Sequence, residues 1–188
     1  MTLTFNNVIQ ITLYMAALLL LAKPVGAYMA QVYEGKARFL AFIERPLYAL
    51  FGTREDAEMG WKTYAVAMLL FNLLGFVIVY VLQRVQGLLP FNPAHMSAIM
   101  PDSAFNTAVS FASNTNWQGY GGETTMSYLT QMIALTVQNF VSAASGMATL
   151  VALIRGLSRK SSQHIGNFWV DMTKNTLKLS QNSFHSVK

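Results

Sequence analysis

The chain has 188 residues, of which 53% are hydrophobic and only 11% are charged, and its mean hydropathy is +0.35. This composition excludes an ordinary soluble domain and indicates a membrane protein. Lys and Arg outnumber Asp and Glu by 13 to 8, but they form no basic patch interleaved with aromatic residues, which argues against nucleic-acid binding. With no cysteine and three widely spaced histidines, the sequence offers no zinc or haem site.

The first predicted element is a transmembrane helix over residues 8–28, within a leading segment 1–31. No Lys or Arg precedes it, whereas a cleaved signal peptide begins with a positive region. Lys23 stands near its end, where a lysine can extend to the membrane interface. We therefore interpret the segment as a retained anchor helix.

Two further transmembrane helices are predicted over residues 64–82 and 128–154, neither of which contains a charged residue. Basic residues gather in the loop 32–63 and directly after the third span, and are absent from the head and from the connection 86–127. They are Lys36, Arg38, Arg45, Arg54 and Lys62, and then Arg155, Arg159 and Lys160. The positive-inside rule therefore predicts cytoplasmic segments 32–63 and 156–188 and an outward N-terminus.

The connection between the second and third spans is too apolar for a solvated loop and too interrupted for a spanning helix. After three prolines, Asp102 and Ser103 are favourable N-cap residues for a short helix over 104–112. A polar, glycine-bearing loop over 113–122 follows. We expect an all-α membrane protein in which residues 64–155 form a membrane–pore–membrane repeat with a re-entrant pore helix, 103–112, and a filter loop, 113–122.

A potassium-selective pore replaces the water around the ion with oxygen atoms, usually backbone carbonyls. The carbonyl end of a re-entrant helix would also favour a cation. Between Asp102 and Glu123 the sequence has no charged residue. The tripeptide Gly119-Tyr120-Gly121 is similar to the GYG of potassium-channel filters, but Trp117 and Gln118 precede it where the channel pattern TVGYG has Thr and Val.

Residues 106–145, NTAVSFASNTNWQGYGGETTMSYLTQMIALTVQNFVSAAS, resemble the first pore repeat of the potassium-binding A subunit of Kdp-type potassium-transporting ATPases. The combination of SNTNWQ with LTVQNF is more specific than GYG. Shorter matches extend the resemblance to roughly residues 8–177. They are Lys23-Pro24, Trp61-Lys62, Leu153-Ile154-Arg155, Gly166-Asn167 and Trp169-Val170-Asp171.

The resemblance implies a subunit with four such repeats around one ion path, which selects potassium and passes it to a partner P-type ATPase catalytic subunit in the bacterial inner membrane. Small accessory subunits of the same complex are implied as further partners, and potassium is the transported substrate rather than a cofactor. Catalytic residues are not implied in this chain. The implied potassium-binding residues of the filter are Ser113, Asn114, Thr115, Asn116 and Gln118, and the exit turn is Gly119, Tyr120, Gly121 and Gly122.

Only one repeat is present, and the segment after Leu177 is polar where a further apolar span would be expected, so we expect a fragment of a longer subunit. One alternative is a stand-alone pore protein whose single repeat forms a homotetramer. A second is a membrane-embedded enzyme, against which stand the missing phosphate-binding and HExxH motifs and the lack of acids and histidines in the spans.

Overall fold

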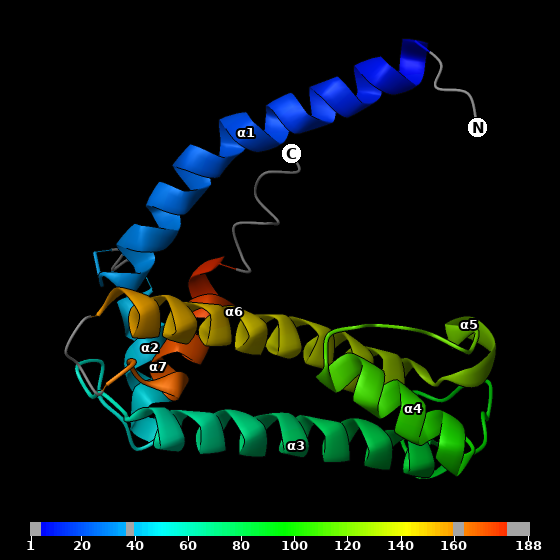
Figure 1. Ribbon diagram of the computed structural model, residues 1–188. Coiled ribbons are helices and arrows are strands. Elements are labelled where there is room, and N and C mark those ends of the chain that lie inside the picture. Colours follow the sequence, from blue (N-terminus) through cyan, green and yellow to red (C-terminus); the bar gives the residue numbers. More distant parts are fainter. Residues whose placement is uncertain (1–4, 37–39, 160–163, 180–188) are drawn as a thin grey trace. The chain divides into compact units, whose positions relative to one another are not determined.

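The computed structural model describes residues 5–36, 40–159 and 164–179 (Figure 1). Arg38, Lys160 and the polar tail from residue 180 therefore lie outside the described residues. The chain divides into two compact units, residues 1–42 and 43–188. In the described ranges the named elements are all helices, and one isolated antiparallel bridge joins Gly60 to His164. The expected all-α membrane architecture is confirmed at this level.

The first unit is dominated by α1 (Phe5–Tyr33), which is 29 residues long. At about 1.5 Å per residue, it exceeds the roughly 30 Å hydrocarbon core of a bilayer. Pro24 lies inside it without ending it, as transmembrane helices tolerate. Within α1 only Val32 is buried, which suits a helix whose apolar surface faces lipid or another protein segment.

In the second unit, α3 (Trp61–Val85) continues into the short turn η1 (Gln86–Leu88), and the π-helical turn η2 (Thr130–Thr136) continues into α6 (Val137–Ser158). Together with α1, these are three helices long and apolar enough to cross a membrane. In α3 and α6 the length follows from the apolar runs 64–82 and 128–154, which are free of charge. The side-chain amide of Asn72 on α3 donates to the hydroxyl of Ser145 on α6 at 3.0 Å, a polar contact typical of packed transmembrane helices.

The short helix α4 (Pro101–Ala112) packs between α3 and α6 at one end of the unit (Figure 1). It begins earlier than the sequence analysis expected, because Pro101 occupies the first helical position and Met100 is the N-cap residue. The assignment of Asp102 and Ser103 as N-caps is therefore wrong. Asp102 instead lies in the first turn, where a carboxylate favours the positive end of the helix dipole.

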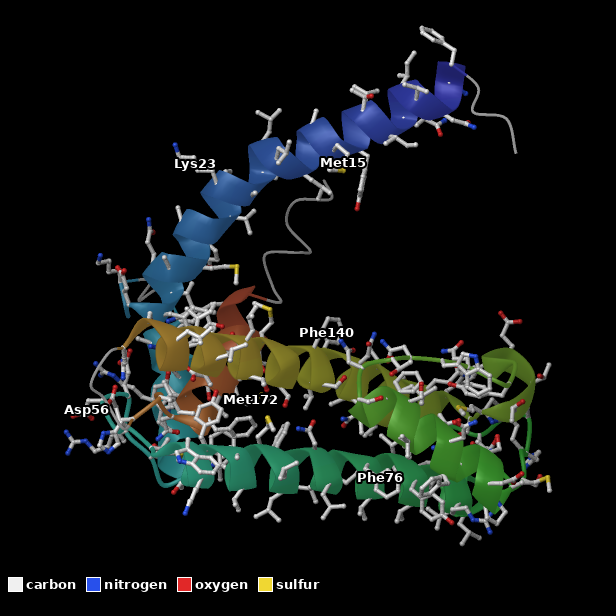
Figure 2. The ribbon with its side chains drawn as sticks, in the orientation of Figure 1. Met15, Lys23, Asp56, Phe76, Phe140 and Met172 are labelled. Atoms are coloured by element: carbon white, nitrogen blue, oxygen red, sulfur yellow. The ribbon has the colours of Figure 1, made fainter. Side chains whose placement is uncertain are left out.

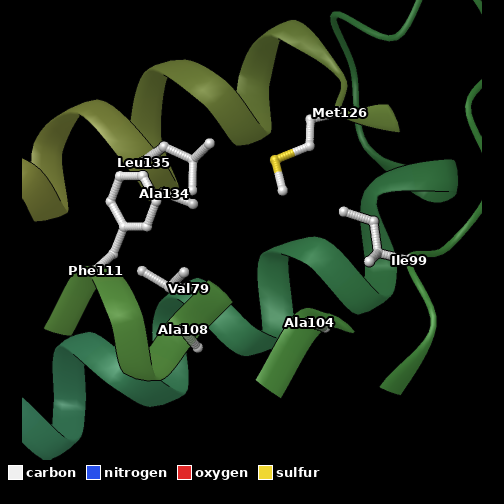
Figure 3. Close-up of a cluster of buried hydrophobic side chains, with 8 residues drawn as sticks. All are labelled: Val79, Ile99, Ala104, Ala108, Phe111, Met126, Ala134 and Leu135. Atoms are coloured by element: carbon white, nitrogen blue, oxygen red, sulfur yellow. The ribbon is translucent and has the colours of Figure 1, made fainter. Parts of the chain in front are cut away.

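A hydrophobic core fixes α4 in place. It joins small residues of α4, such as Ala104 and Ala108, to side chains from the preceding and following segments (Figure 3). The small residues allow α4 to approach α3 closely. The buried members are Val79, Ile99, Ala104, Ala108, Phe111, Met126, Ala134 and Leu135.

A second core lies at the other end of the unit, where α7 (Phe168–Lys174) packs against α6. The side chain of Asn167 caps α7 by accepting from the amides of Trp169 and Val170. Phe168 is fully buried beside Tyr64, and Met172 lies between α3 and α6 (Figure 2). This packing gives α6 a rigid support far from α4.

Ion pairs join the segment around α2 (Ala41–Leu50) to the segment from the end of α6 to the π-helical turn η3 (Asn175–Leu179). They are Glu44–Lys178 at 2.6 Å, Glu58–Arg159 at 2.8 Å and Glu55–Lys174 at 3.3 Å. Burial, with further repulsion from Glu44, raises the pKa of the nearby Tyr48 hydroxyl, so that this group stays neutral.

Arg155 and Asp171 form a fourth pair, with N–O distances of 2.6 and 3.0 Å, and the Asp171 side chain is only 1% exposed. The hydroxyl of Tyr64 lies 3.0 Å from the same carboxylate. A buried carboxylate with this many donors is fully satisfied.

Candidate functional site

The polar loop that follows α4 runs alongside the start of α6 to the four-residue helix α5 (Gly122–Thr125) (Figure 1). Two side-chain contacts tie it to α6. The amide of Asn116 donates to Oδ1 of Asn139 at 2.7 Å, and the hydroxyl of Ser142 donates to Oδ1 of Asn114 at 3.3 Å. These contacts hold the loop against a long helix rather than leaving it free.

The backbone amides at the start of the loop all turn back to the end of α4. The amide of Ser113 donates to Val109 and that of Asn114 to Phe111, at 2.9 and 3.3 Å. The amides of Thr115 and Asn116 both donate to the carbonyl of Ser110, at 2.9 and 3.2 Å. The loop thereby satisfies carbonyls that a helix end normally leaves without partners.

The loop carbonyls show the opposite pattern. Within the described part of the chain, no hydrogen bond reaches the carbonyl oxygens of Ser113, Asn114, Thr115, Asn116 or Gln118. The carbonyl of Trp117 accepts from the Ser110 hydroxyl at 3.0 Å. The loop thus presents backbone oxygens while the amides of residues 113–116 are already bonded to α4.

The backbone conformation explains this separation of donors and acceptors. Asn114 and Asn116 have φ values of 56° and 54°, in the left-handed region, and Thr115 between them does not. Alternation of this kind turns successive peptides the same way, so that N–H groups gather on one side and carbonyls on the other. Asparagine is among the few residues that adopt this conformation readily.

The GYG tripeptide has no such conformation. Neither Gly119 nor Gly121 has a left-handed φ, and that of Gly121 is −92°. A Cβ added at Gly119 would lie 3.1 Å from the ring of Trp117, so this glycine makes room for the tryptophan. Gly122 begins α5, and its carbonyl accepts from the side chain of Gln131 at 3.1 Å.

The loop side chains are open to the outside of this chain. Ser113, Asn114, Thr115 and Gln118 are exposed, and Asn116 is half-buried. Trp117 is 58% exposed. The described residues contain no group of three or more histidines, cysteines and acids that could hold a metal ion. A cation at this loop would therefore interact with neutral oxygen dipoles rather than with carboxylates.

An open groove of about 510 Å³ adjoins the loop. It is lined by α3, by the C-terminal end of α4 and by α6, and Asn114 of the loop is one of its walls. Asn72 and Ser142 supply further polar atoms in a mainly apolar lining.

Several polar residues that support the loop were not identified as such from the sequence. Asn139, within the third predicted span, contacts Asn116 of the loop. Gln86 and Arg84, just after the second predicted span, both contact the connection that leads to α4, and the sequence did not predict these contacts. Each of these residues is a polar residue within or directly after an apolar span, and this pattern was the signal in the sequence that could have indicated a supporting role.

Comparison with known proteins agrees with the resemblance noted in the sequence. A family model described as the potassium-transporting ATPase A subunit (KdpA) matches residues 12–179. Three similar relatives are each named "Potassium-transporting ATPase potassium-binding subunit".

The relative from Chromobacterium violaceum is 61% identical over 173 residues, covering 90% of this chain and 29% of that protein. The Methylococcus capsulatus relative is 61% identical over 177 residues, covering 93% and 30%. The relative from Sorangium cellulosum is 57% identical over 178 residues, covering 93% and 31%. The chain thus spans less than a third of the length of these relatives. Because the family model covers most of the chain, the chain belongs to the family of potassium-transporting ATPase A subunits.

Proposed function

We propose that this chain forms one pore repeat of a potassium-binding and potassium-translocating subunit in an ATP-driven uptake complex. The observation that carries the proposal is the loop at residues 113–118, whose first amides are bonded to α4 while most of its carbonyls have no partner in the described chain. A row of backbone oxygens is the substitute hydration shell that a potassium filter needs. Exposed unpaired carbonyls are costly in a membrane unless they line an ion path.

In this proposal Ser113, Asn114, Thr115, Asn116 and Gln118 form the filter segment, and residues 119–122 form its exit turn. The left-handed conformations at Asn114 and Asn116 support this placement over the GYG tripeptide. The segment 64–155 is then the membrane–pore–membrane repeat, with α4 as the pore helix.

The partners in the proposal are a P-type ATPase catalytic subunit, which hydrolyses ATP, and small accessory subunits. The complex lies in the bacterial inner membrane, and this chain crosses that membrane several times, with residues 32–63 and 156–188 on the cytoplasmic side. Since the chain covers less than a third of its relatives, we expect the other walls of the filter to come from sequence beyond this chain.

The test uses a chimaera in which this chain replaces the matching segment of the Methylococcus capsulatus relative, expressed with the other subunits of that complex. The chimaera should support potassium uptake at micromolar potassium. Gln118→Arg should abolish it, because two unit charges 4 Å apart at an effective dielectric of 20 repel by about 4 kcal/mol, or roughly a thousandfold in affinity.

The matched control is Tyr120→Phe, which removes one hydroxyl from the exit turn and should leave uptake near the parent value. Normal transport by Gln118→Arg, with loss of selectivity on changing Gly119 or Gly121, would place the filter at GYG instead. Potassium uptake by this chain expressed alone would favour the homotetramer.

A further inference from the structure

Gln86, at the junction of α3 and η1, is fully buried, and all of its side-chain polar atoms are bonded. Its Nε2 donates to the carbonyls of Ser97 at 2.7 Å and Thr125 at 2.9 Å. Its Oε1 accepts from the amide of Ser127 at 3.1 Å. A buried side-chain amide whose nitrogen and oxygen are both hydrogen-bonded links specific segments of the chain, which an apolar core side chain does not do.

The three contacts lie on opposite sides of the candidate filter in the sequence. Ser97 belongs to the connection before α4, whereas Thr125 and Ser127 follow the loop. One side chain on a long helix therefore holds both the entry to the pore segment and its exit. The neighbouring Arg84 adds a bond from its guanidinium to the carbonyl of Ile99 on the entry side only.

The exit side needs such a link because its own structure is weak. The helix α5 has only four residues, too few to be stable by itself. Three features among the described residues help to fix the chain around it. Met126 is buried in the core of Figure 3, Gln86 bonds the residues on either side of that methionine, and the side chain of Gln131 donates to the carbonyls of Gly122 and Met126. The far end of the loop is thus positioned partly from η2 and partly from α3, and Gln86 makes the hydrogen bonds from α3.

We propose that Gln86 is a positioning residue for the filter, which sets the separation between the segment that leads into α4 and the far end of the loop, and so the spacing of the free carbonyls. This inference rests on the proposed function. A carbonyl filter selects through the number and placement of its oxygens. Removing the link should therefore change potassium affinity and selectivity more than the amount of assembled complex.

Gln83 provides a matched control on the same helix. It is also fully buried, but its Nε2 bonds only to the carbonyls of Val79, on its own helix, and Ala104, on α4. It has no contact with the exit side of the loop among the described hydrogen bonds. The two glutamines differ in the feature that the proposal invokes.

The experiment compares Gln86→Met and Gln83→Met in the chimaera described above, purified with its partner subunits. Methionine keeps the size of the side chain and removes its hydrogen bonds. We expect Gln86→Met to raise the KM for potassium by about tenfold and to weaken discrimination against sodium, with the maximal rate within about twofold of the parent. Gln83→Met should change neither the KM for potassium nor the discrimination against sodium by more than about twofold. Hydrogen exchange at the Ser127 amide should accelerate in Gln86→Met only.

Equal effects of the two substitutions on KM, or loss of maximal rate without a change in KM, would overturn the positioning role. So would failure of Gln86→Met to assemble when Gln83→Met does, since Gln86 would then support the fold as a whole. If neither methionine variant assembles, Gln86→Asn and Gln83→Asn, which withdraw the amide by one methylene, must show the same contrast. A parent chimaera that does not take up potassium contradicts the proposed function, whereas a working parent with an unaffected Gln86→Met contradicts only this inference.

Discussion

Asn114 and Asn116 show how single residues determine what the loop can offer. Their left-handed backbone turns the loop amides toward α4 and leaves the carbonyls free. The SNTNWQ motif indicated both positions as oxygen-bearing residues of the filter, but it did not predict their backbone conformation. Asparagine occurs in loops of many conformations, so its presence alone does not specify a left-handed φ.

At Asn114 we predict that Asn114→Gly, although it removes the contact with Ser142, retains much more potassium uptake by the chimaera than Asn114→Val, which should abolish it. Glycine adopts a φ of 56° without strain, whereas a β-branched residue is a strong outlier there. The control is Thr115→Val, which keeps a β-branched residue at a position with an ordinary φ and should transport well. Uptake by Asn114→Val equal to that of the parent would show that the left-handed conformation is unnecessary.

At the scale of helices, the sequence predicted the long elements well and the contacts between them poorly. Spans 64–82 and 128–154 and the short helix after Pro101 follow from local apolar runs, charge-free stretches and proline. The bonds from Gln86 to residues 97, 125 and 127 join segments up to 41 residues apart, and no local pattern specifies such pairs. The same holds for the pairing of Arg155 on α6 with Asp171 on α7.

The Arg155–Asp171 pair leads to a prediction about stability. Asp171→Asn should lower the free energy of unfolding by about 3 kcal/mol, because it leaves a largely buried guanidinium without its counter-charge. The control is Asp56→Asn, which removes the exposed partner of Arg54 and should cost less than about 1 kcal/mol. Thermal unfolding of the detergent-solubilised chain measures both. Equal shifts would mean that Asp171 contributes no more than a surface pair.

For the molecule as a whole, exposed apolar surface indicates that this chain is not surrounded by water. Large hydrophobic residues remain exposed along α1, on one side of α3 and on α6, and the groove beside Asn114 is open. Apolar surface of this kind is typical of contact with lipid or with another protein segment, and the relatives have more than two thirds of their length beyond the part that matches this chain. The fragment character expected from the sequence agrees with the lengths of those relatives.

The proposed orientation predicts labelling in this naturally cysteine-free chain. In intact cells an impermeant thiol reagent should label Leu88→Cys, in the turn η1 on the proposed outward side, and should not label Arg54→Cys. Both native side chains are highly exposed in the structure, so access is decided by the membrane side. Labelling of Arg54→Cys alone would mean that the chain is inserted the other way round.

With the orientation proposed above, the positive charges that form ion pairs around α2 and α7 would serve at two different times. During insertion, cationic residues hold their flanking segments in the cytoplasm, largely regardless of nearby acids. After folding, Arg155, Arg159, Lys174 and Lys178 each lie against a carboxylate, so little of their charge remains for a partner or lipid. Replacing an acid such as Glu58 would therefore lower the stability of the folded protein without changing its orientation in the membrane. Replacing the cations would remove both the signal for orientation and the later ion pairs.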